Sequence, residues 1–187
     1  MTAPDNYYEY LKGRSRLGLW YRRHWLYPRL CRHVKGQALD VGCGIGDFLR
    51  HRPGTVGVDI NPATVEWCRQ QGLDARLMSP DRLPFDDASF DSVVLDNVLE
   101  HLEAPGPLLA EIRRVLRPDG VLVVGVPGRR GYASDPDHKV FYDAPALVAA
   151  MAQARLASKR LFFTPFRSAW LDGHMRQYCV YGVFRRD

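Results

Sequence analysis

The chain has 187 residues, of which 46% are hydrophobic and 25% are charged, and its net charge is +5. This length suits one well-buried core better than two, so the sequence predicts a single domain over residues 1–187. No apolar run approaches the ~18 residues that a membrane span needs, and the first residues lack the layout of a signal peptide, so we expect a cytoplasmic protein. The four cysteines form no CxxC pair, so we predict neither a metal site nor a disulfide framework.

Aromatic and basic side chains are frequent in the first 35 residues. Leu17, Trp20, Tyr21, Trp25, Leu26 and Leu30 recur at near-helical spacing. This pattern predicts one or two helices that form an N-terminal cap (1–35) on a core over 36–187. The basic runs at 12–16 and 22–24 resemble contacts for phosphate or nucleic acid, but a net charge of this size is common in small soluble domains. We therefore interpret the two runs as a solvated helix face.

Short apolar runs alternate with amphipathic segments along the rest of the chain. The strands expected from these runs are 37–41, 55–59, 75–78, 92–96, 121–126, 158–164 and 178–184. The helices expected between them are 46–50, 61–71, 108–116 and 143–154. The run 121–126 is the most apolar, so we place it at the centre of the sheet. The alternation predicts an open, doubly wound α/β sheet.

The first expected strand leads into three closely spaced glycines, Gly42, Gly44 and Gly46. Because glycine has no Cβ, such a loop can turn sharply and bring its N–H groups close to a ligand. The second strand ends in Asp59, whose carboxylate can accept hydrogen bonds from both hydroxyls of a ribose. This pairing predicts a cofactor that carries a nucleoside. A nicotinamide dehydrogenase shares these features, but its GxGxxG fingerprint differs from the GxGxG spacing here.

Five blocks in order carry a resemblance to a known family: LDVGCGIG at 39–46, GVD at 57–59, LPFDDASFD at 83–91, NVLEHL at 97–102 and IRRVLRPDG at 112–120. Together they resemble the class I S-adenosylmethionine-dependent methyltransferases over about half of the chain. The resemblance implies a doubly wound, mostly parallel seven-stranded sheet with helices on both faces and an antiparallel C-terminal strand. It also implies S-adenosyl-L-methionine as the methyl donor.

The resemblance implies a role for each matching position. Asp40, Gly42, Gly44 and Gly46 would hold the methionine end of the cofactor, and Asp59 would bind the ribose. On the adenine, Ile60 would pack on one face, Asp81 would accept a hydrogen bond from the amine and Leu83 would supply apolar packing; Ser79 stands where similar enzymes often have the acid. Asp96 and Asn97 would face the methyl group and the acceptor.

An oxygen or nitrogen acceptor has a proton to lose during methyl transfer, which predicts a base near the methyl group. His101 follows the strand expected at 92–96, and His138 lies between Asp135 and Lys139 in the loop after 121–126. We predict His138 and His101 as catalytic candidates. The alternatives are an orienting role for His101 and an exposed loop position for His138.

The segment Asp96-Asn97-Val98-Leu99 lacks the Asp/Asn-Pro-Pro-Tyr/Phe signature, which argues against methylation of an exocyclic amine. We expect a hydroxyl or carboxyl of a small-molecule or glycan-type acceptor, with the N-terminal helices and residues 164–176 covering the site. Two alternatives stay open: a protein that binds S-adenosylmethionine without catalysis, and a methyltransferase that uses its basic N-terminus on RNA or a nucleotide. The sequence indicates no oligomeric state.

Overall fold

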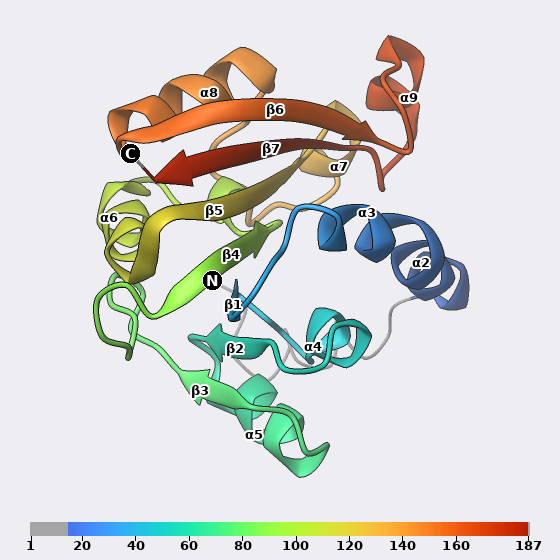
Figure 1. Ribbon diagram of the computed structural model, residues 1–187. Coiled ribbons are helices and arrows are strands. Elements are labelled where there is room, and N and C mark those ends of the chain that lie inside the picture. Colours follow the sequence, from blue (N-terminus) through green and yellow to red (C-terminus); the bar gives the residue numbers. More distant parts are fainter. Residues whose placement is uncertain (1–14, 187) are drawn as a thin grey trace.

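The computed structural model describes residues 15–186, whose strands form one seven-stranded sheet in the order β3-β2-β1-β4-β5-β7-β6 (Figure 1). The strands are β1 (Ala38–Val41), β2 (Val56–Asp59), β3 (Ala75–Leu77), β4 (Phe90–Asp96), β5 (Leu116–Pro127), β6 (Leu156–Thr164) and β7 (Cys179–Arg186). Strands β1 to β5 are parallel, and β7 runs antiparallel to its neighbours β5 and β6. The predicted fold class is confirmed.

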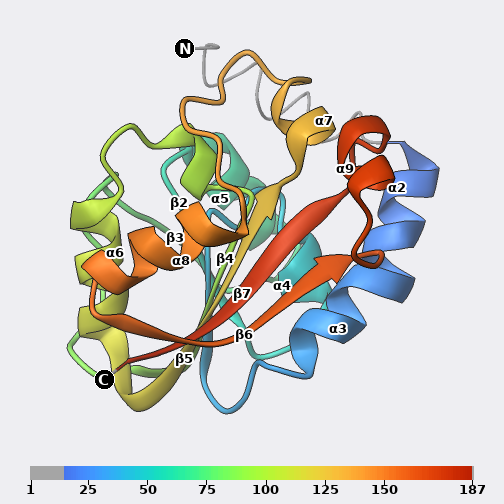
Figure 2. The ribbon, with the colours of Figure 1, turned by 90° about the horizontal axis from the view of Figure 1, so that it is seen from above.

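Helices cover both faces of this sheet (Figure 2). They are α2 (Arg16–Tyr21), α3 (Tyr27–Cys31), α4 (Asp47–His51), α5 (Pro62–Gln70), α6 (Gly106–Val115), α7 (Arg129–Tyr132), α8 (Ala144–Gln153) and α9 (Ala169–His174), with the π-helical η1 (Arg22–Leu26) and the 3₁₀ turn η2 (Leu99–His101). Helices α6 and α8 pack on one face, whereas α3 and α4 pack on the other. Burial from both sides explains the nearly continuous apolar runs of β1, β2 and β5.

The N-terminal helices form one continuous helical run over residues 16–31, because η1 joins α2 to α3. Leu26, Tyr27 and Leu30 are its buried residues, and they pack against the sheet beside α4. The chain is therefore helical from residue 16 to residue 31, as the spacing of the apolar residues predicts. Residues 1–14, including most of the basic run at 12–16, lie outside the described part of the chain.

Strand β5 differs from the prediction in its start and in its position. Leu116 already pairs with Phe90 of β4, and Val121 pairs with Ser92, so residues 117–120 bulge out of the strand. Asp119 adopts a φ of 61° in this bulge, which suits the Pro118-Asp119-Gly120 sequence that we expected to separate helix from strand. The prediction of a central β5 was wrong, since β4 occupies the middle of the sheet. A high apolar content indicates that a strand is buried on both faces, and it does not indicate which strand is in the middle. Both β4 and β5 are largely buried.

The carboxyl ends of the parallel strands meet at one edge of the sheet, at the top of Figure 2. Short helices α7 and α9, which the sequence did not predict, lie at the same edge and pack on each other. In a doubly wound sheet the ligand binds outside this edge. None of the described helices is long and apolar enough to span a bilayer.

Candidate functional site

Three carboxylates gather at the carboxyl edge, because β2, β1 and β4 are consecutive neighbours in the sheet. Asp40 and Asp59 are each only 5% exposed, and Asp96 is partly buried. Burial, followed by the negative charges of Asp96 and Asp59, raises the pKa of Asp40 well above its usual range. Carboxylates held together in this way favour a positively charged ligand.

The glycine loop that follows β1 has the predicted sharp turn. Gly42, Gly44 and Gly46 adopt φ angles of 77°, 52° and 79°, in the left-handed region that glycine occupies without strain. The N–H of Gly44 donates to Oδ2 of Asp59 at 2.8 Å, and the N–H of Asn61 donates to Oδ1 at 2.9 Å. The loops after β1 and β2 therefore hold the Asp59 carboxylate in place. Burial raises the pKa of Asp59, and the hydrogen bonds from Asn61 and Gly44 oppose this shift.

The residues predicted for the adenine differ in their exposure. Ile60 is 59% exposed directly beside buried Asp59, so its side chain is free to pack on a planar ring. Asp81 is exposed in the loop after β3. Leu83 lies in the core, and its N–H donates to Glu111 at 3.0 Å. The structure thus brings Ile60 next to Asp59, while the adenine contacts of Asp81 and Leu83 stay predictions.

Asp96, at the end of β4, is the centre of a hydrogen-bond network. Oδ1 of Asp96 accepts from the hydroxyl of Tyr181 at 2.6 Å and from Nδ2 of Asn97 at 2.9 Å. Nη1 of Arg22 lies 3.4 Å from Oδ2. No local pattern marks Tyr181 or Arg22 as site residues, because they lie 85 and 74 positions from Asp96 in the chain.

Arg22 also corrects the interpretation of residues 22–24 as a solvated helix face. Arg23 and His24 are exposed as expected. Arg22 instead turns toward the sheet, where its side chain is 27% exposed and pairs with Asp96. A partly buried carboxylate is stabilised by a cation, and the helical run over 16–31 supplies one. The N-terminal helical run therefore contacts the candidate site through Arg22.

The two histidines predicted as bases lie together beside the end of β4. Their ring centroids are 4.7 Å apart, and Nε2 of His138 lies 3.8 Å from Oε1 of Glu100. The side chain of His138 is only 8% exposed, so the alternative of an exposed loop histidine is wrong. Burial raises the pKa of Glu100 to about 8 and lowers the pKa of His101, with the nearby His138 adding to the latter shift. Glu100 belongs to the NVLEHL block, but its position in the sequence predicts no role for it.

A glycine loop, an acid at the end of β2 and this strand order define a class of nucleoside-cofactor enzymes, and comparison with known proteins places the chain within it. Residues 39–124 match the family model of a methyltransferase domain. The chain is 35% identical over 138 residues to a "probable S-adenosylmethionine-dependent methyltransferase" of Mycolicibacterium smegmatis, a match that covers 68% of this chain and 52% of that protein. The chain spans about half the length of the curated relatives that it matches.

Solved structures show the same fold over nearly the whole chain. An S-adenosylmethionine-dependent methyltransferase of Thermotoga maritima superposes with a TM-score of 0.73 at 18% identity and covers 97% of this chain and 98% of that chain. A geranyl diphosphate methyltransferase solved with S-adenosylmethionine superposes with a TM-score of 0.67 at 18% identity, covering 87% and 84%. The chain belongs to the class I S-adenosylmethionine-dependent methyltransferases, and S-adenosylmethionine is the cofactor of this family.

The site residues fit this cofactor. Its ribose hydroxyls need an acceptor such as the Asp59 carboxylate, and its amino and sulfonium groups carry positive charge, which Asp40 and Asp96 complement. When bound, it supplies a methyl group on a positively charged sulfur. The individual contacts of Asp40, Gly42, Gly44, Gly46 and Asp59 stay predictions.

Proposed function

We propose that this chain transfers the methyl group of S-adenosylmethionine to a hydroxyl or carboxyl oxygen of a small-molecule or glycan-type acceptor. The observation that carries the proposal is a partly buried histidine pair at the same edge of the sheet as the three carboxylates. His138 and His101 follow β5 and β4 in the chain, and Asp96 lies close enough to Glu100 to affect its ionisation. Binding groups and a proton acceptor thus share one edge of the sheet.

Each group has a distinct task in this proposal. Asp40 and Asp59 bind the cofactor, while Tyr181 and Arg22 fix the Asp96 carboxylate at the end of β4. A displacement at a methyl group requires alignment of the nucleophile, which these fixed side chains promote. The proton of a hydroxyl acceptor passes to an imidazole nitrogen of the histidine pair.

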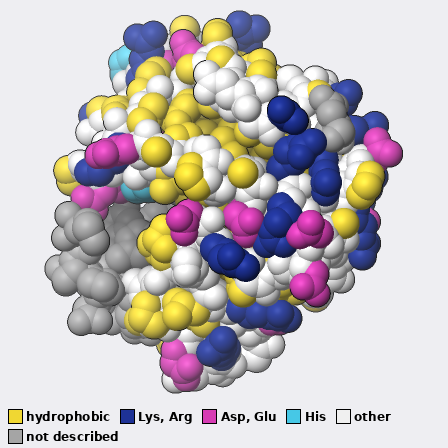
Figure 3. Space-filling view, turned by 90° about the vertical axis from the view of Figure 1, so that its left-hand side faces the viewer, with side chains coloured by type: hydrophobic (Ala, Val, Ile, Leu, Met, Phe, Trp, Pro, Cys, Tyr) yellow, Lys and Arg dark blue, Asp and Glu magenta, His cyan; other side chains and the backbone are white. Residues whose placement is uncertain are grey.

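Asn97 supports an oxygen acceptor over an exocyclic amine. Its side-chain amide donates to Asp96 at 2.9 Å, so it is already engaged within the protein. The backbone of Asn97 has a φ of 56°. The first proline of the Asp/Asn-Pro-Pro-Tyr/Phe signature would stand at this position, and the ring of proline holds φ at about −65°. RNA is the second acceptor class to test. The face of the molecule in Figure 3 intersperses basic and acidic side chains and presents no single-sign surface for a polyanion.

The test is methyl transfer from radioactive S-adenosylmethionine to a panel of hydroxylated and carboxylated compounds, with total RNA as a separate arm. We expect incorporation into at least one oxygen acceptor. Replacing His138 by Ala is expected to lower turnover by roughly 10²–10⁴-fold and to leave the affinity for S-adenosylhomocysteine unchanged. His174→Ala, in exposed α9, is the matched control and is expected to keep full turnover.

Two results would overturn the proposal. Cofactor binding without turnover on any acceptor would make the chain a non-catalytic S-adenosylmethionine-binding protein. Incorporation into RNA alone, with an affinity that falls steeply as salt rises, would make it an RNA-directed methyltransferase.

A further inference from the structure

The histidine pair and Glu100 form a cluster whose chemistry goes beyond a base. Glu100 and His101 belong to η2, whereas His138 lies in the loop after α7. The N–H groups of Lys139 and Val140 donate to the carbonyl of Glu100 at 2.7 and 3.1 Å. These two backbone hydrogen bonds hold the loop against η2 and set the position of His138 next to Glu100.

The hydrogen bond of His138 determines which ring nitrogen faces Glu100. Nδ1 of His138 lies 2.8 Å from the carbonyl oxygen of Tyr132. A carbonyl can only accept, so Nδ1 donates, and Nε2 is the ring nitrogen that faces Glu100. Nε2 lies 3.8 Å from Oε1 of the Glu100 side chain. Fixing one ring nitrogen on a backbone carbonyl is also how proteins orient histidines that bind metal ions.

The second histidine is held in a similar way. His101 makes a hydrogen bond with the backbone of Asp137, and its ring meets His138 edge to face at 4.7 Å. These contacts fix the orientation of the His101 ring, and one nitrogen of each ring is left to bind a ligand.

Glu100 is the least satisfied group of the cluster. It is 1% exposed, and within residues 15–186 neither of its carboxylate oxygens accepts a hydrogen bond from another residue. Burying a carboxylate without a partner is costly. A cation held between Glu100 and Nε2 of His138 would offset this cost.

We propose that Glu100, His101 and His138 bind a divalent transition-metal ion at the carboxyl end of β4. Their ligand atoms all lie within 4.8 Å of one another. Metal–ligand bonds of about 2.0–2.2 Å require the side chains to close by about 1 Å. Two imidazoles and one carboxylate suit Zn²⁺, Mn²⁺ or Fe²⁺ better than Ca²⁺ or Mg²⁺, and three protein ligands leave coordination positions open.

The consequence for catalysis rests on the proposed function. An acceptor hydroxyl bound at an open position would lose its proton more easily, because a metal ion lowers the pKa of a bound oxygen. His138 would then act as a metal ligand and not as the base. Acceptors with a second oxygen that also reaches the ion would be favoured over isolated alcohols.

The experiment is a calorimetric titration of the full chain with ZnCl₂, after treatment with a chelator and its removal. We expect one high-affinity ion per chain. Glu100→Gln and His138→Gln are each expected to weaken this binding at least tenfold, whereas His174→Gln is expected to leave it unchanged. Co²⁺ gives a second readout, since visible d–d absorption should appear in the wild type and be lost in both variants of the cluster.

Affinity for S-adenosylhomocysteine, measured on the same samples, shows whether each variant is folded. The wild-type titration needs no variant, so the proposal is overturned if Zn²⁺, Mn²⁺ and Co²⁺ all fail to bind stoichiometrically. It is also overturned if folded cluster variants bind the ion as the wild type does. Metal binding without methyl transfer would refute the proposed function alone, whereas chelator-resistant transfer by a chain that binds no ion would refute the metal site alone.

Discussion

At the carboxyl edge of the sheet, Asp40 and Asp59 are buried, and burial raises their pKa values. At the amino edge, Asp91 and Glu111 are paired with arginines, and their pKa values are lowered. Asp91, near the start of β4, accepts from the N–H of Gln37 and from Arg117, both at 2.8 Å, and these contacts lower its pKa. Asp96 ends the same strand within the site. One strand thus carries a structural acid and a site acid.

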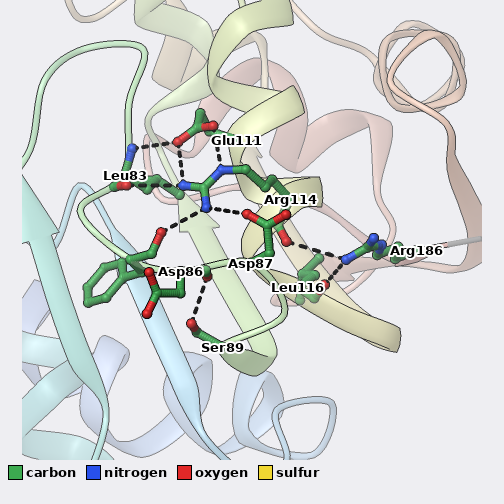
Figure 4. A network of polar contacts seen from close by, with 9 residues as sticks. Leu83, Asp86, Asp87, Ser89, Glu111, Arg114, Leu116 and Arg186 are labelled. Atoms are coloured by element: carbon green, nitrogen blue, oxygen red, sulfur yellow. Dashed lines mark hydrogen bonds and ion pairs between the residues drawn. The ribbon is translucent and has the colours of Figure 1, made fainter.

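The amino edge shows what a fully compensated acid looks like (Figure 4). The guanidinium of Arg114 donates to both oxygens of Glu111 at 2.7 Å and to Asp87 at 2.8 Å. It also donates to the carbonyls of Leu83 and Phe85, which fastens the loop before β4 to α6. Such acids stabilise the fold at neutral pH, whereas acids with raised pKa values cost stability and point to ligand binding.

Among the changes that test this comparison of the two edges, removing an acid at the carboxyl edge has the largest expected effect. Asp59→Ala should weaken binding of S-adenosylhomocysteine by about 10- to 100-fold, since hydrogen bonds to a charged group contribute about 1.5–3 kcal/mol. Calorimetry measures the affinity, and circular dichroism checks that the variant is folded. Unchanged affinity in a folded variant would refute the ribose contact of Asp59.

Asp91→Ala is the matched control at the other edge. It removes the contacts to Gln37 and Arg117, so it should lower the free energy of unfolding while leaving cofactor affinity unchanged. If both variants lost affinity to the same extent, the functional distinction between the two edges would be wrong.

A smaller, pH-dependent effect is expected at Glu111. Arg114 lowers the pKa of Glu111 to about 2 from its usual 4.5, so the pair stabilises the fold above pH 4.5 and the contribution is lost as pH falls toward 2. Because the pair is partly exposed to solvent, we expect Glu111→Gln to cost only about 1 kcal/mol at pH 7. Urea unfolding at neutral and acidic pH should show the difference shrinking on acidification. Glu66→Gln, at an exposed position of α5, should show no such change.

The fold was largely predictable because its signals are local. Apolar runs located all seven strands, and Asn61 and Asp143 cap α5 and α8 as expected, each accepting from a backbone N–H at 2.9 Å. Short α7 and α9 were missed, since helices of four and six residues carry too few positions for a periodic pattern. The two helices pack on each other, and Arg129 of α7 forms an ion pair with Asp172 of α9, so their contacts join distant parts of the chain.

The site residues also fall into two groups: those that a local sequence pattern marks, and those that only the folded sheet brings together. The glycine loop and Asp59 lie within one strand–turn–strand segment, so their spacing alone indicated a cofactor. Arg22 and Tyr181 join Asp96 only through the folded sheet, and no local pattern marks them. Glu100 was visible in the sequence, but its burial without hydrogen bonds from other described residues is a property of three-dimensional packing.

The smallest expected effect tests the charge of Asp96 at the carboxyl edge. Arg22→Met removes the guanidinium that lies 3.4 Å from Asp96 and keeps most of the aliphatic packing. Asp96 then becomes more negative toward the methyl group, which favours the positively charged sulfonium over neutral sulfur. We expect the ratio of affinities for S-adenosylmethionine and S-adenosylhomocysteine to rise about two- to fivefold, since both partners keep some contact with solvent. Arg23→Met, at the exposed neighbouring position, should leave the ratio unchanged. A ratio that stays constant in Arg22→Met would place the methyl group away from Asp96, and the carboxyl edge would then bind the cofactor through Asp40 and Asp59 alone.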